Sequence, residues 1–262
     1  MPEGDTVFRT ARTLHRALAG QVLLRTDFRV PSLANADLAG QQVLEVRSRG
    51  KHLLLRTSGG WTLHTHLRMD GQWRVQRTGE PLPRGPVRVV LETPRYTALA
   101  LEMPVVELVA TAEEERVVGH LGPDLLGPDW DEAEALRRLG LQPDREIGDA
   151  LLDQRNLAGI GNLYKAEVLF LKGVNPWTPV GRVPELPELL ALARRLLEFS
   201  VRHGVQSTTG ALRGSEKNWV FERPGRPCRR CGSLVQVRRQ GSVPGQERLS
   251  YWCPACQPER GA

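Results

Sequence analysis

Hydrophobic and polar positions follow two periods along the chain, and the change between them divides it. Apolar residues recur at helical spacing from Asp5 to Leu18, and Gly20 follows as a stop, which predicts an amino-terminal helix. From Val22 to about Ala110 the pattern becomes short strand-like runs separated by Gly and Pro. We expect strands at 42–47, 52–56, 61–66, 72–75, 88–91 and 105–109. Many short strands with turns between them are typical of an antiparallel sandwich or barrel.

The helical period returns from about Trp130. We expect helices at 131–139, 149–156, 162–171 and 186–202, the last with Pro187 in its first turn, where proline is tolerated. A stretch rich in Gly and Pro at 122–128 reads as a linker, and all the cysteines follow Pro224. The pattern therefore predicts an α+β protein in three parts: a sheet domain with flanking helices at 1–122, a helical domain at 129–223 and a cysteine module at 224–262.

Size and composition narrow the class of protein. A chain of 262 residues can form one large domain or two modest ones, and 40% hydrophobic with 25% charged residues is ordinary for a globular protein. No apolar run could cross a bilayer and no secretory signal opens the chain, so we expect a cytoplasmic protein without a membrane partner. The net charge of +6 favours a phosphate-rich partner such as nucleic acid.

The four cysteines form two Cys-x-x-Cys pairs: Cys228 with Cys231, and Cys253 with Cys256. A cytoplasmic chain argues against structural disulfides, and four thiolates suit one tetrahedral zinc. Redox-active or unpaired cysteines are the alternative. Since four thiolates leave no open coordination position, we expect one structural Zn²⁺ per chain rather than a catalytic metal.

The chain begins Met1-Pro2-Glu3-Gly4. Removal of Met1 would leave Pro2 with a free secondary amine, whose pKa is roughly 7.7–8 for an α-amino group against about 10.4 for a lysine. A useful fraction is then unprotonated near neutral pH and can form a Schiff base with an electrophilic carbon. Glu3 adds a carboxylate beside that amine. The ordinary alternative is that many chains start Met-Pro for no catalytic reason.

Three polar residues stand where a phosphate could be bound. Asn162 begins a predicted helix after a glycine-containing turn at 157–162, and helix N-termini bind phosphate. Lys51 lies between two expected strands, and Arg248 lies on the returning limb of the cysteine hairpin. Their ordinary alternatives are a helix cap, a solvated loop cation and an exposed arginine.

Taken together these segments resemble the bacterial formamidopyrimidine-DNA glycosylase and endonuclease VIII family. The resemblance runs nearly end to end, with the motifs in family order and at family-like spacing. It rests on Pro2-Glu3-Gly4, Arg49-Gly50-Lys51-His52, the 157–162 turn with Tyr164-Lys165-Ala166-Glu167, Cys228-Arg229-Arg230-Cys231-Gly232 and Tyr251-Trp252-Cys253-Pro254-Ala255-Cys256. It implies an antiparallel β-sandwich carrying the amino-terminal helix, a helix–two-turns–helix domain with a zinc-finger β-hairpin, and DNA in the cleft between them.

The resemblance also implies a role for each candidate residue. Pro2 would be the nucleophile on the sugar C1′ carbon, and Glu3 would move protons during base loss and ring opening. Lys51, Asn162 and Arg248 would hold phosphates around the lesion, with the target base flipped out of the duplex. The implied protein is a monomeric bifunctional glycosylase and abasic-site lyase that cuts damaged DNA by β,δ-elimination and is associated with the nucleoid.

The branch of the family is indicated by local features. Gly4 resembles the endonuclease VIII branch, and the Arg-Arg-Phe-Gly loop of the formamidopyrimidine branch has no counterpart in the corresponding stretch at 101–107. The connection at 207–219 is also short. The stretch at 66–71 points the other way, with Met69 as a wedge in the base stack or, alternatively, a core residue. Arg68 or His120 would support the opposite strand.

The chain departs from the family at Asp5-Thr6, where Pro-Glu is usual. Asp5 either substitutes for the missing glutamate or caps the helix. We expect an enzyme acting on oxidised pyrimidines. The alternatives are an oxidised-purine glycosylase, a non-catalytic lesion-binding relative, which the retained Pro2, Glu3 and Lys51 argue against, and a plain zinc-ribbon adaptor, which would leave the first half of the chain unexplained.

Overall fold

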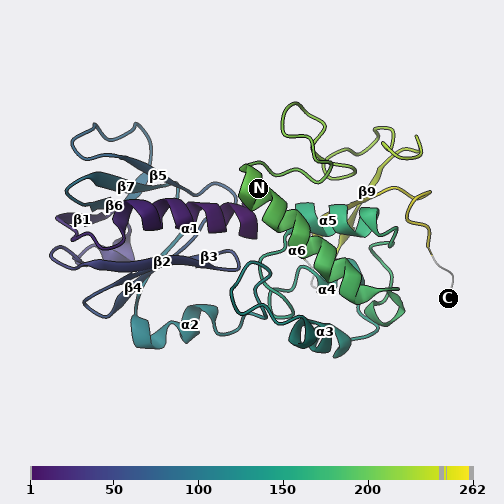
Figure 1. Ribbon diagram of the computed structural model, residues 1–262, viewed down its shortest axis with the longest axis horizontal. Helices are drawn as coiled ribbons and strands as arrows, with labels where there is room; N and C mark the ends of the chain where they lie inside the picture. Colours follow the sequence, from purple (N-terminus) through teal and green to yellow (C-terminus); the bar gives the residue numbers. More distant parts are fainter. Residues whose placement is uncertain (1, 242–244, 246, 260–262) are drawn as a thin grey trace. The chain divides into compact units, whose positions relative to one another are not determined.

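The computed structural model describes residues 2–241, 245 and 247–259 (Figure 1). The chain divides into two compact units, residues 1–120 and 121–262, each with its own core. Within the described residues, no helix combines the length and apolar character that crossing a bilayer requires.

The first unit is a sandwich of two four-stranded antiparallel sheets, with strand orders β1-β6-β7-β5 and β2-β3-β4-β8. Its strands are β1 (Arg25–Phe28), β2 (Val43–Arg49), β3 (His52–Thr57), β4 (Trp61–His66), β5 (Gln72–Arg77), β6 (Val87–Glu92), β7 (Tyr96–Leu101) and β8 (Val105–Ala110). Its helical segments are α1 (Gly4–Leu18), α2 (Glu115–Val118) and two short 3-10 turns, η1 (Pro31–Leu33) and η2 (Thr111–Glu113). The predicted antiparallel sandwich is therefore confirmed.

Helix α1 lies along the sandwich and packs against β2 and β3 of one sheet and β5 and β7 of the other (Figure 1). Val7, Ala11, Leu14 and Leu18 recur at helical spacing and are all buried, which gives the helix one apolar face. These side chains join the inner faces of both sheets in one core. The start of α1, which carries the candidate nucleophile, is thereby anchored to the sandwich.

Two strands and one helix of this unit were not among the sequence expectations. Strand β1 is short and mostly polar, and only Phe28 is buried. Strand β7 is buried on both faces, because Ala98 and Ala100 join the main core while Leu99 packs with Val87 and Val90 on the other side. A strand buried on both faces shows no alternation of polar and apolar residues, so its period cannot be recognised. Helix α2 is too short to show a helical period.

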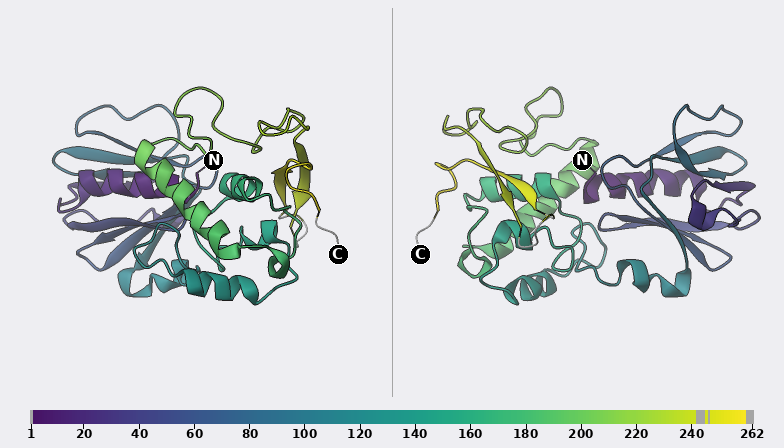
Figure 2. Two further views of the ribbon diagram at one scale, coloured as in Figure 1. Left: turned by 45° about the vertical axis from the view of Figure 1, so that its right-hand side comes forward. Right: turned by 180° about the vertical axis from the view of Figure 1, so that it is seen from behind.

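The second unit holds α3 (Glu132–Gly140), α4 (Ile147–Ala150), α5 (Asn162–Leu171), η3 (Val180–Arg182), α6 (Leu186–His203) and a hairpin of β9 (Gln236–Gln240) and β10 (Arg248–Trp252). Helix α5 is buried from Leu163 to Phe170 and packs against α6 and β10. Figure 2 shows the β9–β10 hairpin from two sides. The cysteine module thus shares the core of the helical region instead of standing apart from it.

The helix expected at 149–156 is wrong. Helix α4 covers only Ile147–Ala150, and the chain then turns. Asp153 accepts a hydrogen bond from the backbone N–H of Arg155 through its side chain and from the N–H of Asn156 through its carbonyl oxygen. The side-chain amide of Asn156 donates to the carbonyl of Ala150. Such local side-chain bonds to the backbone compete with the helical pattern and end it here.

Candidate active site and metal centre

The first candidate group lies at the start of α1. Pro2 is partly buried, and Glu3 is fully buried and occupies the N-cap position of the helix. The carbonyl of Glu3 accepts from the N–H groups of Thr6 and Val7, while its carboxylate makes no capping hydrogen bond. The Glu3 carboxylate therefore belongs to the residue that follows Pro2, and it does not cap the helix.

Asp5 is in the first turn of α1 and is also fully buried. Its carboxylate lies 4.0 Å from the guanidinium of Arg9. The alternative in which Asp5 caps the helix is wrong, because Glu3 holds that position. A second buried carboxylate thus stands one turn from the amino terminus, where the family usually has a glutamate at the next position.

Lys51 lies at the tip of a hairpin. Strand β2 ends at Arg49 and strand β3 begins at His52, and these two residues pair across the ladder. Gly50 and Lys51 therefore form the whole turn. Gly50 has φ +56°, a conformation that glycine adopts without a steric cost. A two-residue turn fixes the register of both strands and allows the Lys51 backbone little freedom.

Met69 is at the tip of the loop between β4 and β5. It is 62% exposed, so the alternative in which Met69 is a core residue is wrong. The loop is anchored by buried Leu67, whose carbonyl accepts from the N–H of Gly71, and a Cβ at Gly71 would lie 2.7 Å from that carbonyl oxygen. Arg68 is exposed beside Met69 with φ +51°. A tight anchored loop therefore presents Arg68 and Met69 outward.

Four histidines gather on the face of the β2-β3-β4-β8 sheet that points away from the core: His52, His64, His66 and His120. Among them, the sequence analysis singled out only His120 as a candidate. Burial lowers the pKa of His52 to about 3 and that of His66 to about 4, and neighbouring positive charges act in the same direction. The sequence signal was the alternation His64-Thr65-His66, which places both rings on one face of β4.

Asn162 is the first residue of α5, and Gly161 occupies the N-cap without a side-chain cap. The alternative in which Asn162 caps the helix is therefore wrong. Its side-chain Nδ2 donates instead to the carbonyl oxygen of Leu249, 2.9 Å away. Leu249 follows Arg248, the first residue of β10, whose side chain is exposed. The structure thus places Asn162 against the residue that follows Arg248, although the two candidates lie far apart in the sequence.

The short connection before the zinc module is closed at its base by Glu167. This fully buried carboxylate accepts from the hydroxyl of Thr208 and from the backbone N–H groups of Trp219, Val220 and Phe221, the last three at 2.7–2.8 Å. Burial raises the pKa of Glu167, and the four donors oppose that shift. Residues on both sides of the connection are therefore held by one side chain.

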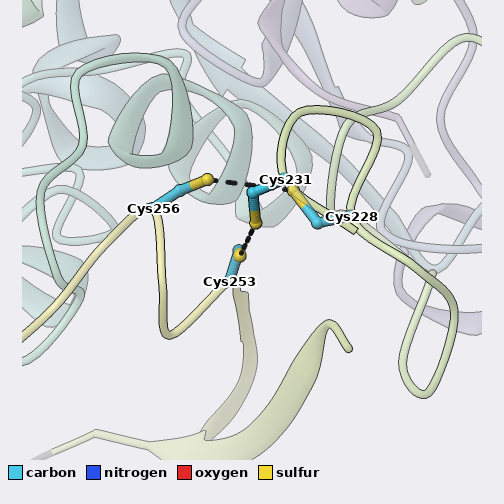
Figure 3. Close-up of side chains that lie close together, drawn as sticks. All are labelled: Cys228, Cys231, Cys253 and Cys256. Atoms are coloured by element: carbon cyan, nitrogen blue, oxygen red, sulfur yellow. Dashed lines mark hydrogen bonds between the residues drawn. The ribbon is translucent and has the colours of Figure 1, made fainter. Parts of the chain in front are cut away.

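The four cysteines form a compact cluster (Figure 3), with all Sγ atoms within 4.8 Å of one another. The Sγ–Sγ distance is 3.9 Å between Cys228 and Cys256 and 3.4 Å between Cys231 and Cys253, and none is in a disulfide. Four thiolates at about 2.3 Å from a tetrahedral zinc would lie about 3.8 Å apart. The cluster therefore fits a metal ion of zinc size. Hydrogen bonds from Ser233 lower the pKa of Cys231 to about 6, which favours the thiolate form.

Comparison with known proteins agrees with this arrangement. The family model of the formamidopyrimidine-DNA glycosylase N-terminal domain matches residues 1–102, and that of the H2TH domain of the same glycosylase matches residues 121–211. The "Probable endonuclease 8 2" of Streptomyces coelicolor is 55% identical, covering 98% of this chain and 94% of that protein. The "DNA-(apurinic or apyrimidinic site) lyase Nei2" of Mycolicibacterium smegmatis is 44% identical, and the match covers 98% of this chain and 99% of that protein. "Endonuclease 8" of Escherichia coli K12 is 35% identical, and the match covers 98% of this chain and 100% of that protein.

The fold is also that of solved structures. Lactococcus lactis Fpg in complex with DNA containing an abasic site matches with a TM-score of 0.80 at 23% identity, over 98% of this chain and 100% of that one. Together the sandwich, the helical unit and the cysteine cluster define a DNA glycosylase of the helix–two-turns–helix type. The chain belongs to the formamidopyrimidine-DNA glycosylase and endonuclease VIII family. The names of these relatives confirm the resemblance to its endonuclease VIII branch.

Proposed function

We propose that this protein is a bifunctional DNA glycosylase and abasic-site lyase that removes oxidised pyrimidines and cuts the strand by β,δ-elimination. Its relatives carry the names endonuclease 8 and abasic-site lyase. The observation that carries the proposal is the start of α1, where the buried carboxylate of Glu3 follows Pro2 and is not used to cap the helix. A nucleophile with a proton-transfer group beside it is the arrangement that covalent catalysis requires.

The reaction follows from these two residues. The unprotonated Pro2 nitrogen attacks the C1′ carbon of the damaged nucleotide, and the bond from C1′ to the base breaks with a proton delivered to the departing base. Glu3 moves protons during base loss and sugar-ring opening. The ring-opened sugar is then joined to Pro2 as an iminium ion, which acidifies the C2′ proton. Loss of the C2′ proton expels the 3′ phosphate, and loss of a second proton, from C4′, then expels the 5′ phosphate. Water hydrolyses the remaining iminium, which releases the sugar fragment and restores the Pro2 amine.

The other candidate residues bind DNA in this proposal. Lys51, Asn162 and Arg248 contact phosphates around the lesion. Exposed Met69 fills the gap left by the flipped base, and Arg68 or His120 supports the opposite strand. The partner is damaged DNA, bound by a monomer associated with the cytoplasmic nucleoid. In this proposal the chain has three functional parts. Residues 1–122 carry out catalysis, residues 129–223 bind DNA, and residues 224–262 form the zinc finger.

Zinc has a structural role in this proposal. Cys228, Cys231, Cys253 and Cys256 hold one Zn²⁺, which stabilises the hairpin that carries Arg248. The close approach of the four thiols supports this assignment, because four unbridged thiols brought this near are the donor set that zinc prefers. No reaction step passes through the metal.

Borohydride trapping tests the proposal directly. Reduction of the protein with abasic-site DNA should give a stable covalent complex, and peptide mass analysis should place the adduct on Pro2. The K51A variant, which keeps the amine, provides the matched control and should still form the Pro2 adduct once enough DNA is supplied. An adduct on a lysine, or active protein that retains Met1, would contradict the mechanism. A protein that binds lesion DNA without trapping would be the non-catalytic relative.

A further inference from the structure

The histidine group on the outer face of the β2-β3-β4-β8 sheet has no assigned part in the chemistry above, apart from His120. The chain has six histidines, and four of them meet here. The ring centroid of His52 lies 5.0 Å from that of His64, 4.9 Å from that of His66 and 6.0 Å from that of His120. His52 also directly follows Lys51, so the group lies at the root of the turn that carries the proposed phosphate contact.

A chain of hydrogen bonds runs through this group. Oε2 of Glu107 on β8 lies 2.8 Å from Nδ1 of His64, and Nε2 of His64 lies 2.8 Å from Nδ1 of His52. The two ring planes are within 18° of each other and their centroids are 5.0 Å apart, which is compatible with a hydrogen bond in the plane of both rings. His64 is only 3% exposed, so its bonds are shielded from water.

The donors in this chain can be assigned. An ionised Glu107 accepts only, so Nδ1 of His64 carries the proton and donates to it. A neutral His64 then has an acceptor at Nε2, which receives the proton that Nδ1 of His52 donates. This leaves Nε2 of His52 as the nitrogen with a lone pair. The terminal acceptor of the chain is therefore on the residue next to Lys51.

Charges around His52 oppose its protonation. His64 and His66 on β4, His120 after α2 and Arg68 in the following loop all lower the pKa of His52, after burial as the main cause. Lys51 and Arg68 act in the same way on His66. Across the β2–β3 ladder His52 pairs with another cation, Arg49. Glu107 supplies the negative charge that is hydrogen-bonded to this chain, through His64, and its side chain is half exposed. Burial and these positive charges therefore keep His52 and His66 neutral near pH 7 in the unliganded protein.

We propose that the Glu107–His64–His52 chain takes up a proton when a DNA phosphate docks beside Lys51, so that DNA binding is linked to proton uptake. This inference rests on the proposed function. The phosphodiester brings one negative charge, and a proton from solvent bonds to Nε2 of His52. The resulting imidazolium donates from Nδ1 to His64, which donates to Glu107, so the carboxylate stabilises the new charge through two hydrogen bonds.

The direction of the pH dependence follows. An anion beside a histidine raises its pKa, here from about 3 in free His52 toward the ordinary value of about 6.5. The DNA-bound protein then holds more protons than the free protein between these two values. Falling pH therefore favours the complex, by up to about tenfold in affinity per pH unit for each linked proton.

Isothermal titration calorimetry can count this proton. The full-length protein is titrated with duplex DNA containing a tetrahydrofuran abasic analogue, which it cannot cleave, in two buffers of different ionisation heat. At pH 5.5 the heats should differ by the amount that proton uptake predicts, and the dissociation constant should be several-fold lower than at pH 8. The titration is repeated at intervals from pH 5.5 to 8. This separates the two groups, because the Pro2 amine titrates at a higher pH than the histidine chain.

Variants decide whether the chain is responsible. Glu107→Gln keeps an acceptor for His64 but removes the charge, so proton uptake at pH 5.5 should fall while affinity at pH 8 stays unchanged. His52→Gln should remove the uptake, and the Glu107→Gln variant alone decides the question if the His52 variant does not fold. His203→Gln, on α6 in the other unit, is the matched control and should behave as the wild type.

The outcomes are distinguishable. Wild-type protein that binds and cleaves abasic DNA with a pH-independent affinity overturns this inference and leaves the proposed function intact. The inference is equally overturned if Glu107→Gln and His52→Gln keep the full uptake. Protein that neither binds nor is trapped on abasic DNA contradicts the proposed function itself.

Discussion

The side-chain amide of Asn162 donates a hydrogen bond to the carbonyl of Leu249, 2.9 Å away. The bond joins the start of α5 to β10 and places Asn162 next to the residue that follows Arg248. One amide hydrogen is used in this way, and a second remains on the same nitrogen. A further link, from the buried ammonium of Lys165 to the hydroxyl of Ser250 at 2.7 Å, fixes the same strand on the same helix. These two bonds hold strand β10, which begins with Arg248, against helix α5.

The two proposed cationic phosphate contacts should respond alike to salt. Lys51→Ala and Arg248→Ala should each weaken binding of abasic-site DNA about tenfold or more, since a charged hydrogen bond contributes about 1.5–3 kcal/mol. Each should also lower the slope of log affinity against log salt by up to about 0.9. Fluorescence anisotropy over a salt series measures both quantities. Arg116→Ala, which removes an exposed arginine paired with Glu113, is the control; wild-type slopes in both test variants would show that these cations are merely solvated.

Glu3→Gln should separate binding from chemistry. The variant keeps the volume of the buried side chain but cannot exchange protons, so base removal should slow by about 10²-fold or more. Affinity for lesion DNA should stay close to that of the wild type. Single-turnover rates on a lesion duplex, measured beside the dissociation constant, test this. Equal base-removal rates in variant and wild type would exclude Glu3 from the proton transfer.

Removal of zinc should affect the hairpin first. A chelator should release one zinc per chain, measured by elemental analysis, and disorder the segment around the four cysteines, because metal binding and folding are coupled in such modules. The sandwich and the helical core should survive, so far-UV circular dichroism should change little while strand cleavage falls. Metal-free protein with full activity would contradict the structural role.

The lesion preference should favour pyrimidines. Release of thymine glycol or 5-hydroxyuracil should be faster than release of 8-oxoguanine opposite cytosine, because the short connection at 207–219 offers few backbone amides to enclose a flipped purine. Parallel single-turnover rates decide this, and a clear preference for 8-oxoguanine would move the chain to the other branch of the family.

The wedge can be tested separately. Met69 is exposed at a loop tip. Met69→Ala should slow cleavage of duplex substrates more than that of single strands, because only a duplex has a paired gap to fill. Leu141→Ala, at another exposed apolar residue, is the control. An equal effect on both substrates would exclude the wedge.

As the pH falls, the free protein should begin to lose stability at a higher pH than the protonation of carboxylates alone would predict. His52 and His66 have pKa values lowered to about 3 and about 4, whereas unfolded histidines titrate near 6.5. The unfolded state therefore binds more protons as pH falls below 6.5, and stability declines from there toward pH 4. Thermal unfolding between pH 7 and 5.5, above the carboxylate range, measures this. The decline should be shallower in His66→Gln than in the wild type.

The sequence predicted the parts of the site whose signal is local. The apolar spacing of α1, the pairs of cysteines and the turn before Asn162 are each visible within a short stretch. The approach of Asn162 to Leu249 depends on how the hairpin packs on α5, which no local pattern encodes. The histidine group was missed for a similar reason: His52 and His64 come from paired strands, and only the register of β3 and β4 brings them together.

Because Glu167 holds both ends of the connection at 207–219, the residues between those ends can be replaced. Thr208 at one end and Trp219 at the other are held by the same carboxylate, so the ends stay close whatever lies between them. Lengthening a loop whose ends are already fixed adds little entropic cost, roughly 0.6 kcal/mol for each doubling. This stretch can therefore diverge or be replaced without refolding the rest. Under the proposed mechanism, the set of lesions that the enzyme accepts could change in this way while the Pro2 amine is retained.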